Sequence, residues 1–340
     1  MRACQVCEKV EANVATGYGI TLCNGCKMVY RRHTLIKEER QEPIVCNHSK
    51  RCHRCTLIKC LEFGLKMFRE SKEVQLLKAL NARNAVRSSN FINSQPREDL
   101  NLKEIMRRGP IKFETKTVNI QDLNSHQWAN LQMVTTIEFM KTFDVMKHLT
   151  ETEVTGFIKK TYFNTAIFFM AMNSYFSGQS AMMFPGNKDV FPEETAPIHE
   201  IGSSYWGLFN SIRCELIAKF IELQVSQDEL LLLAVVISCG SIITEKPIVI
   251  EDANGEIIIN HPPISTLGSQ FIQSYRDFHL TALFDNCMKN ENAHGHIRYN
   301  NLLSIIQLVT QTMQKLDMTY HLFQLYQRDG NLSKLVREFF

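Results

Sequence analysis

Two pairs of cysteines near the N-terminus have the spacing of a metal site. Two residues separate Cys4 from Cys7, two separate Cys23 from Cys26, and 15 residues lie between the pairs. Four sulfurs arranged in this way suit tetrahedral zinc, and four-sulfur coordination leaves no position for a reacting water. The spacing therefore predicts a structural zinc ion rather than a catalytic one.

The cysteines are concentrated at this end of the chain. Eight of the eleven lie within the first 60 residues, and the starting sequence MRACQVCEKV has no apolar segment of the kind that directs secretion. Without such a signal, a dense cysteine cluster indicates metal binding rather than disulfides. The remaining three lie in apolar stretches and are expected to be small buried hydrophobic residues: Cys214, Cys239 and Cys287.

The segment after Cys23 could form a helix with one basic face. If residues 24–33 are helical, at about 100° per residue, Val29, Tyr30 and His33 lie on one side. The opposite face carries Asn24, Lys27, Met28, Arg31 and Arg32. Lysine and arginine on a zinc-anchored helix suit the major groove of DNA, where they read guanine edges and neutralise phosphates. A basic face that only contacts water is the other interpretation of this pattern.

The charge of the chain is unevenly distributed, with a basic N-terminal part and an acidic remainder. Residues 1–112 carry 22 Lys/Arg and 11 Asp/Glu, whereas residues 113–340 carry 16 and 24, for a net charge of +3. A basic end joined to an acidic body predicts contact with a polyanion. The longest apolar run, 230–237, is too short to cross a membrane. The sequence also lacks the nucleophile-elbow, phosphate-loop and His-Glu-x-x-His motifs, so we expect neither a membrane protein nor an enzyme.

Composition and periodicity divide the chain into three segments. Residues 1–68 form a Cys-rich basic module. Residues 69–98 contain the Ser, Asn and Pro typical of a linker, with a short helix expected at 73–85. Residues 99–340 show helical patterns, which predicts a mainly α chain.

Local signals mark three structural features of this third segment. Thr150-Glu-Thr-Glu153 and Ser226-Gln-Asp-Glu229 both fit the capping box, in which the first and fourth side chains cap a helix start. Ala-Asn-Gly at 253–255, before an Ile-rich stretch, predicts a small hairpin.

Four longer motifs occupy the first module. They are Cys4-Gln-Val-Cys7, Gly17-Tyr-Gly-Ile20, Cys23-Asn-Gly-Cys-Lys-Met-Val-Tyr-Arg-Arg32 and Cys52-His-Arg-Cys-Thr-Leu-Ile-Lys-Cys60-Leu-Glu-Phe-Gly-Leu65. Together they resemble the DNA-binding domain of nuclear hormone receptors, in the divergent style of nematode receptors. The resemblance implies two structural zinc ions and double-stranded DNA as a partner. It also implies roles for the helix residues: Asn24, Gly25 and Met28 as specificity positions, and Lys27, Arg31 and Arg32 as contacts to bases or phosphates.

The second zinc module departs from the family pattern. Only 25 residues separate Cys26 from Cys52, fewer than the family usually has, and the loss falls after Cys46. By the resemblance, Cys52 and Cys55 are the last two ligands, and Cys46 is the first or the second. The fourth ligand is then one of His48, His53 and Cys60, or the site is degenerate. The family uses the shortened loop for dimer contacts on DNA, so the resemblance does not extend to cooperative dimer binding through this module.

The same residues suggest a rival interpretation. Cys46-x-His48-x3-Cys52-x2-Cys55 resembles the middle of a cross-braced RING-type zinc fold, as in ubiquitin ligases. That fold needs a further Cys-x2-Cys, which the sequence lacks, and it does not account for the basic residues behind Cys26. The alternative function is a zinc-bearing interaction protein, a RING-like ligase or a corepressor adaptor, that does not read DNA.

Two stretches of the third segment resemble the family's ligand-binding domain. Residues 137–158 match the signature in which one helix ends and the next is capped, with Glu153-Val154 where the family has Asp-Gln. The C-terminal stretch carries one apolar stripe at helical spacing: Leu332, Leu335, Val336, Phe339 and Phe340. The resemblance implies an all-α, three-layer domain over 99–340 that ends in an activation helix.

The resemblance also assigns a partner to this helix. Lys141 and Glu338 would hold the two ends of a short coactivator or corepressor helix, because a lysine suits C-terminal carbonyls and a glutamate suits N-terminal amides. Ile137 and Ile158 would line the groove between them. A terminal helix that only docks on the core is the other interpretation.

The resemblance also implies that this domain binds a small lipophilic ligand. The pocket residues would be Gln132, Met133, Thr136, Met140, Phe169, Met172, Asn173 and Phe323, although Met and Phe at helical spacing are more often simply core. Some relatives hold a carboxylate ligand through an arginine at the position of Asn173. The asparagine therefore argues against an acidic ligand held in that way.

These observations predict one function for the whole chain. We expect a ligand-regulated or orphan nuclear hormone receptor, located in the nucleus, that binds specific DNA sequences. It would regulate transcription by RNA polymerase II through its C-terminal helix, with a dimer formed through the ligand-binding domain.

Overall fold

The computed structural model of the chain describes residues 2–11, 14–17, 20–35, 56, 59, 72–191, 203–240, 248–251, 257–260, 264–291, 294–326 and 333–339. The chain divides into two compact units, Met1–Gln75 and Leu76–Phe340, and each is described by itself. None of the helices formed by these residues has both the length and the apolar character needed to cross a membrane.

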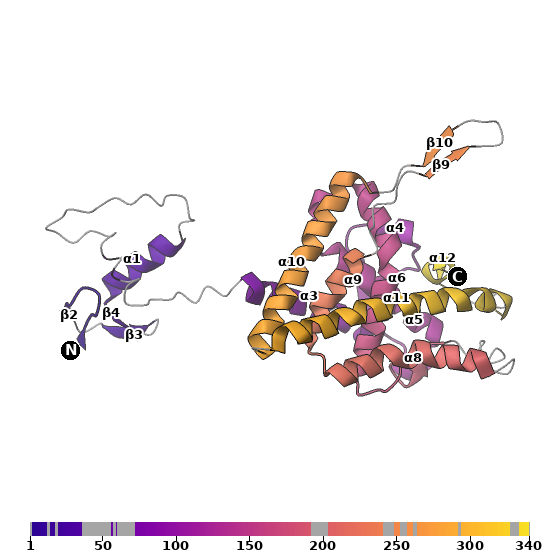
Figure 1. The fold of residues 1–340 in the computed structure, drawn as a ribbon, viewed down its shortest axis with the longest axis horizontal. Coiled ribbons are helices and arrows are strands. Elements are labelled where there is room, and N and C mark those ends of the chain that lie inside the picture. The colour runs from indigo at the N-terminus through magenta and orange to yellow at the C-terminus, as the bar shows by residue number, and fades with distance from the viewer. Residues whose placement is uncertain are drawn as a thin grey trace. The chain divides into compact units, whose positions relative to one another are not determined.

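The first unit consists of short strands followed by a helix (Figure 1). Strand β1 (Arg2–Ala3) pairs antiparallel with β2 (Val10–Glu11), and β3 (Ala15–Gly17) pairs antiparallel with β4 (Ile20–Leu22). Helix α1 (Asn24–Leu35) begins directly after the second strand pair. The helix expected at 24–33 is therefore confirmed, with two further residues at its C-terminal end.

The second unit is built mainly of helices, which confirms the mainly α fold class. Its described helices are α3 (Lys72–Asn93), which belongs to this unit from Leu76 onward, α4 (Leu102–Arg107), α5 (Ser125–Lys141), α6 (Glu151–Phe176), α8 (Ser203–Leu223), α9 (Gln227–Gly240), α10 (Thr266–Glu291), α11 (Gly295–Tyr326) and α12 (Lys334–Phe339). Two 3-10 turns precede α5 and α6: η1 (Ile120–Asp122) and η2 (Asp144–His148). The strands form antiparallel pairs: β5 (Ser94–Pro96) with β6 (Phe113–Thr115), β7 (Met183–Phe184) with β8 (Lys188–Asp189), and β9 (Ile248–Glu251) with β10 (Ile257–Asn260).

Helices α6 and α9 form the middle of the second unit (Figure 1). Helix α9 is buried continuously from Glu229 to Cys239 and packs against α6 and α10. Helix α6 also packs against α5 and α8, and α11 packs against α8 and α10. The order α5, then α6 with α9, then α10 with α11 gives the three layers that were expected, around one hydrophobic core.

The local signals in the sequence formed the predicted structures. The Thr150 hydroxyl accepts from Glu153 N–H while the Glu153 carboxylate accepts from Thr150 N–H at 2.8 Å, which confirms the capping box that starts α6. Ser226 and Glu229 exchange the same pair of bonds at the start of α9. The predicted hairpin is confirmed by the antiparallel pairing of β9 with β10.

Helix α3 contains the short helix expected at 73–85, but it extends to Asn93 through the segment 69–98 that composition predicted to be a linker. It spans 22 residues, and Leu77, Leu80 and Phe91 lie in the core of the second unit. The buried residues of α3 recur at helical spacing, and two of them are polar: Leu77, Leu80, Asn84, Arg87 and Phe91. Packing of this face, rather than composition, stabilises the helix.

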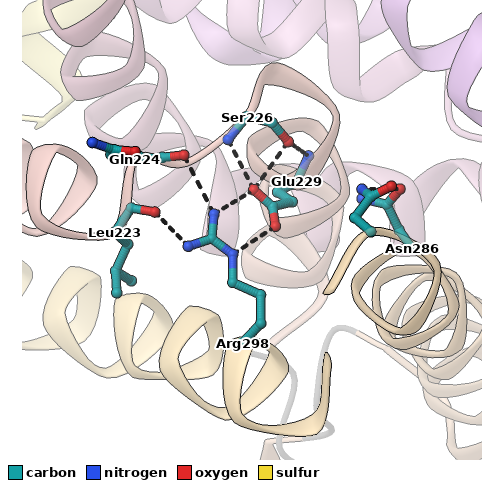
Figure 2. A network of polar contacts seen from close by, with 7 residues as sticks. Leu223, Gln224, Ser226, Glu229, Asn286 and Arg298 are labelled. Carbon is teal, nitrogen blue, oxygen red and sulfur yellow. Dashed lines mark hydrogen bonds and ion pairs between the residues drawn. The ribbon is translucent and has the colours of Figure 1, made fainter. Parts of the chain in front are cut away.

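A buried polar network joins α8, α9 and α11 (Figure 2). The Arg298 guanidinium on α11 donates to both carboxylate oxygens of Glu229, at 2.9 Å from Nε and 2.8 Å from Nη2. It also donates to the carbonyl oxygens of Leu223 and Gln224 at the C-terminal end of α8. Burial alone would raise the pKa of Glu229, but Arg298 and the Ser226 amide lower it overall. The network fixes the turn between α8 and α9 onto α11.

Candidate metal centre and binding surfaces

The four predicted zinc ligands lie together in the first unit. The sulfur atoms of Cys4, Cys7, Cys23 and Cys26 are all within 4.8 Å of one another, and Cys7 Sγ lies 3.6 Å from Cys23 Sγ. A tetrahedron with Zn–S bonds of about 2.3 Å has edges of about 3.8 Å. The donor set and its spacing therefore fit a zinc ion.

Two tight backbone turns bring these cysteines together. Cys4 N–H donates to Lys9 O at 2.9 Å, and Glu8 N–H donates to Cys4 O at 2.7 Å. Glu8 has a φ of 61°, in the left-handed region that closes such a turn. At the other pair, Cys26 N–H donates to Cys23 Sγ at 3.5 Å, because α1 starts between these two ligands.

The zinc site provides much of the interior of the first unit. Its buried hydrophobic cluster among the described residues comprises Cys4, Val6, Val14, Leu22, Cys23 and Cys26, so half of its members are predicted ligands. Burial and the neighbouring Cys23 and Cys7 thiols raise the pKa of Cys26 above its usual range. Four crowded sulfurs cannot all ionise without a cation among them, which again fits a divalent metal.

The ligands predicted for the second zinc site lie outside the described residues. They are Cys46, Cys52 and Cys55, with His48, His53 or Cys60 as the fourth. The second zinc site therefore stays a prediction.

The predicted DNA-contacting residues lie along α1. Asn24 and Gly25 are exposed, Met28 is 45% exposed and Lys27 is half-buried. Arg31 and Arg32 belong to the helix, but their side chains lie outside the described residues. The structure thus brings part of the predicted face to the surface, directly beside the metal ligands.

Lys141, the predicted clamp lysine, already binds the end of a helix. Its Nζ donates to the carbonyl oxygen of Ile105 at 2.9 Å, in the last turn of α4, and to that of Gly109 at 3.3 Å. It also donates to Glu138 Oε1 at 2.7 Å. The other predicted groove residues, Ile137 and Ile158, are fully buried.

The C-terminal helix α12 packs on α5. Its Leu335 is fully buried, and Lys334 N–H donates to Asp99 Oδ1 at 3.0 Å, which caps the helix start. Glu338 belongs to α12, although its side chain lies outside the described residues. The remaining stripe residues are not described at the side-chain level: Leu332, Val336, Phe339 and Phe340.

Most residues of the predicted ligand pocket lie in the interior. The buried ones are Gln132, Met133, Thr136, Met140, Phe169 and Met172; Asn173 is half-buried, and the side chain of Phe323 on α11 is not described. Asn173 Nδ2 donates to Gln132 Oε1 at 3.1 Å, and Gln132 Nε2 donates to Thr136 Oγ1 at 3.3 Å. Three of the predicted pocket residues therefore form one polar chain between α5 and α6.

Arg87 on α3 is a polar residue of this interior that sequence reasoning missed. It is buried, and its Nη2 donates to Asn173 Oδ1 at 3.0 Å. Its spacing from Leu80 and Phe91 on the same helix, at seven and four residues, was the signal that could have placed it on the inward side.

Comparison with protein families gives a match for each unit. A family model described as the ligand-binding domain of nuclear hormone receptor matches residues 114–326. A second, described as a double treble clef zinc finger of the C4 type, matches residues 2–67.

Curated proteins that resemble the chain do so over nearly its whole length. It is 26% identical to nuclear hormone receptor family member nhr-9 of Caenorhabditis elegans, over 99% of this chain and 96% of that protein. It is 28% identical to family member nhr-27 of the same organism, over 95% of this chain and 88% of that protein. For family member nhr-268, also of C. elegans, the identity is 25%, over 99% of this chain and 98% of that protein.

Proposed function

The chain belongs to the nuclear hormone receptor family, and from this premise we propose that it is a nuclear transcription factor that reads specific duplex DNA through α1 and regulates RNA polymerase II through α12. It is a zinc-finger protein with a ligand-binding domain and is not an enzyme. The observation that carries the proposal is the sulfur cluster of the first unit, because α1 starts between two of the cluster's members.

In this proposal the zinc ion fixes the start of α1 so that its exposed face enters the major groove. Asn24, Gly25 and Met28 would then meet base edges. A Cβ added at Gly25 would meet only Cys23 Sγ, at an ordinary 3.8 Å, so packing does not require glycine there. The missing side chain supports a role in close approach to DNA. Lys27 and the two arginines of α1, Arg31 and Arg32, would neutralise phosphates or read guanine.

DNA binding by the full chain tests this proposal. Changing Lys27 and Arg32 to alanine should lower affinity and reduce the slope of log affinity against log salt by up to about 2, since each lost phosphate contact removes about 0.9. The matched control changes Lys103 and Lys159, two exposed lysines of the helical unit, and should leave both quantities unchanged. Equal binding by the two variants would instead support a zinc-bearing interaction module that does not read DNA.

We propose a second zinc ion held by Cys46, Cys52 and Cys55 with one further ligand. Elemental analysis of the full chain should give two zinc ions per molecule. Replacement of His48, His53 and Cys60 in turn should reduce this number at the true fourth ligand alone.

We propose that the functional modules are a DNA-binding module over 1–68 and a ligand-binding module that continues to 340. The packing of α3 into the core supports extending the second module back into the segment 69–98, where a linker was expected. The ligand-binding module would then begin with α3 and not at residue 99, where the sequence analysis placed its start.

Lys141 and Glu338 are proposed to hold a short partner helix. The support is chemical: Lys141 donates to the carbonyls at the C-terminal end of α4, which is the contact that a partner helix would need. A partner would then have to displace α4 from Lys141 and uncover Ile137 and Ile158.

The capping box of α4 offers a test of this displacement. Asn101→Ala removes the side chain that accepts from Glu104 N–H and should weaken α4 by about 1 kcal/mol. It should therefore raise affinity for a short amphipathic helix peptide severalfold, whereas Lys141→Met should lower it. A fall in peptide affinity with Asn101→Ala would contradict the displacement.

A small lipophilic ligand and a dimer complete the proposal. The polar chain of Gln132, Thr136 and Asn173 supports a ligand site within the predicted pocket. Large apolar side chains are exposed on α10, which supports contact with a second copy: Leu267, Phe271, Phe278, Phe284 and Met288. Sedimentation of the full chain with and without Phe278→Glu would show whether this surface forms the dimer.

A further inference from the structure

Helix α4 buries one apolar face in the second unit. Leu102 is 6% exposed, Ile105 is fully buried and Met106 is half-buried, so the buried residues stand at positions i, i+3 and i+4. The helix packs on α6, and Leu102 and Ile105 belong to the same hydrophobic cluster as the proposed groove residues Ile137 and Ile158. This spacing is the one by which a short amphipathic helix anchors in a groove of another protein.

Both ends of α4 are held as the ends of a partner helix would be. At the C-terminal end, Lys141 Nζ donates to Ile105 O at 2.9 Å. At the N-terminal end lies the start of α12, where Lys334 Nζ is 3.7 Å from Glu104 Oε2 and Lys334 N–H donates to Asp99 Oδ1 at 3.0 Å. Helix α4 therefore runs from α12 to Lys141, and the proposed partner helix has the same direction between the same two elements.

The segment that carries α4 is a loop closed at its base. Strands β5 and β6 pair antiparallel on either side of it, with Pro96 opposite Phe113, so its ends remain joined when its middle moves. The helix also brings its own capping box, formed by Asn101 and Glu104. A helix of 6 residues is too short to be stable alone in water. Its helical form therefore depends on the surface that it covers.

We propose that α4 is a resident substitute for the partner helix: it occupies the surface between α12 and Lys141, and a partner binds there by replacing it. The partner is then a short helix with large apolar residues at i, i+3 and i+4 and with free C-terminal carbonyls for Lys141. Because β5 and β6 tether α4, its effective concentration is on the order of millimolar, so it competes with any partner in solution. This inference rests on the proposed function in one respect, namely that Lys141 and α12 hold a partner helix.

Fluorescence anisotropy of a labelled peptide with the sequence of residues 99–110 tests the proposal, because this peptide is the α4 segment itself. In a linker variant of the full chain, a Gly-Ser linker of equal length replaces residues 101–107 and leaves β5 and β6 in place. The linker variant should bind the peptide at least about 10-fold more tightly than the wild-type chain, because the tethered competitor is gone. Adding Lys141→Met to the linker variant should weaken this binding at least about 3-fold.

Two point variants of the same helix give a matched comparison. Ile105→Ala removes the most buried anchor of α4, whereas Lys103→Ala changes an exposed residue. Ile105→Ala should raise affinity for the peptide at least about 3-fold, because α4 then docks less well. Lys103→Ala should change the affinity less than about 2-fold. If the linker variant does not fold, these two variants decide alone.

Two results would overturn the proposal. One is equal affinity for the peptide in the wild-type chain, the linker variant and Ile105→Ala: the surface would then take a helix that α4 does not exclude, and the proposed partner site would survive. The other is the absence of peptide binding by the folded variants, in which case the proposed partner site fails together with this inference. DNA binding measured on the same samples tests the other part of the proposed function separately.

Discussion

Replacing Arg298 by methionine should destabilise the helical unit by about 3 kcal/mol. The Arg298 side chain is 16% exposed and that of Glu229 is 6% exposed. The change therefore leaves a buried carboxylate without its cation and with almost no access to water. Breaking a buried ion pair from one side costs about 3–5 kcal/mol. We take the lower end, because Glu229 keeps the bonds from Ser226 and because methionine keeps most of the apolar length.

A double-mutant cycle separates the ion pair from the other contacts of Arg298. Glu229→Gln alone should cost about 1–3 kcal/mol, because a charged acceptor becomes a neutral one. The double variant should then be more stable than the sum of the single effects predicts, by roughly 1–3 kcal/mol, since the two side chains touch. Additive losses would show that the pair itself contributes nothing.

Urea unfolding of the full chain, followed by far-ultraviolet circular dichroism, measures these changes. The control is Arg276→Met. Arg276 also pairs with a carboxylate, that of its neighbour Asp277, but the two side chains are 33% and 55% exposed. This control should change stability by less than about 0.5 kcal/mol. If Arg298→Met and Arg276→Met changed stability equally, burial would not be what makes the Arg298–Glu229 pair the stronger one.

Three further predictions concern the metal, one glycine and acid stability. A strong zinc chelator should abolish DNA binding and unfold the first unit, because the metal ligands form half of its small buried cluster. The urea midpoint of the helical unit should stay unchanged. Retained DNA binding without zinc would contradict this prediction. Gly268→Ala should cost about 1–3 kcal/mol, since the new Cβ would lie 2.6 Å from Glu153 Oε1. The same change at Gly207, which has nothing within 4 Å, should be neutral or stabilising. Hydrogen bonds from Ser265 and Thr150 lower the pKa of Glu153 to about 2. The stability that the Glu153 carboxylate adds to the folded state is therefore complete above its unfolded pKa of about 4.3, and it is lost as the pH falls toward 2. Urea midpoints of wild type and Glu153→Gln should therefore converge with falling pH, and a constant difference would rule this out.

The sequence predicted structure well wherever the signal was local. The capping boxes at Thr150 and Ser226 each need only four residues, and both formed. The cysteine pairs are separated by one strand-rich segment, and their sulfurs converge. Spacing is sufficient in these cases because the chain between the interacting groups is short.

Contacts between distant segments could not be predicted in this way. Glu229 was recognised as a capping residue, but its bond to Arg298 joins residues 69 apart, and periodicity carries no information about such a pair. The asparagine at 173 argued against an arginine-held acid, yet the structure brings the guanidinium of Arg87 to it from another helix. Composition suggested a linker for that helix because Ser and Asn are frequent there, whereas burial of Phe91 depends on the whole fold.

In-vitro selection of duplex DNA by the zinc-loaded full chain, at two salt concentrations, tests directly whether the chain reads a specific DNA sequence. Cys23→Ser, which removes one sulfur of the cluster, is the matched control. The proposed function predicts that the wild-type chain enriches one sequence motif, that this binding weakens steeply with salt, and that the variant enriches none. A folded, zinc-loaded wild-type chain that enriches no motif at either salt concentration would contradict it.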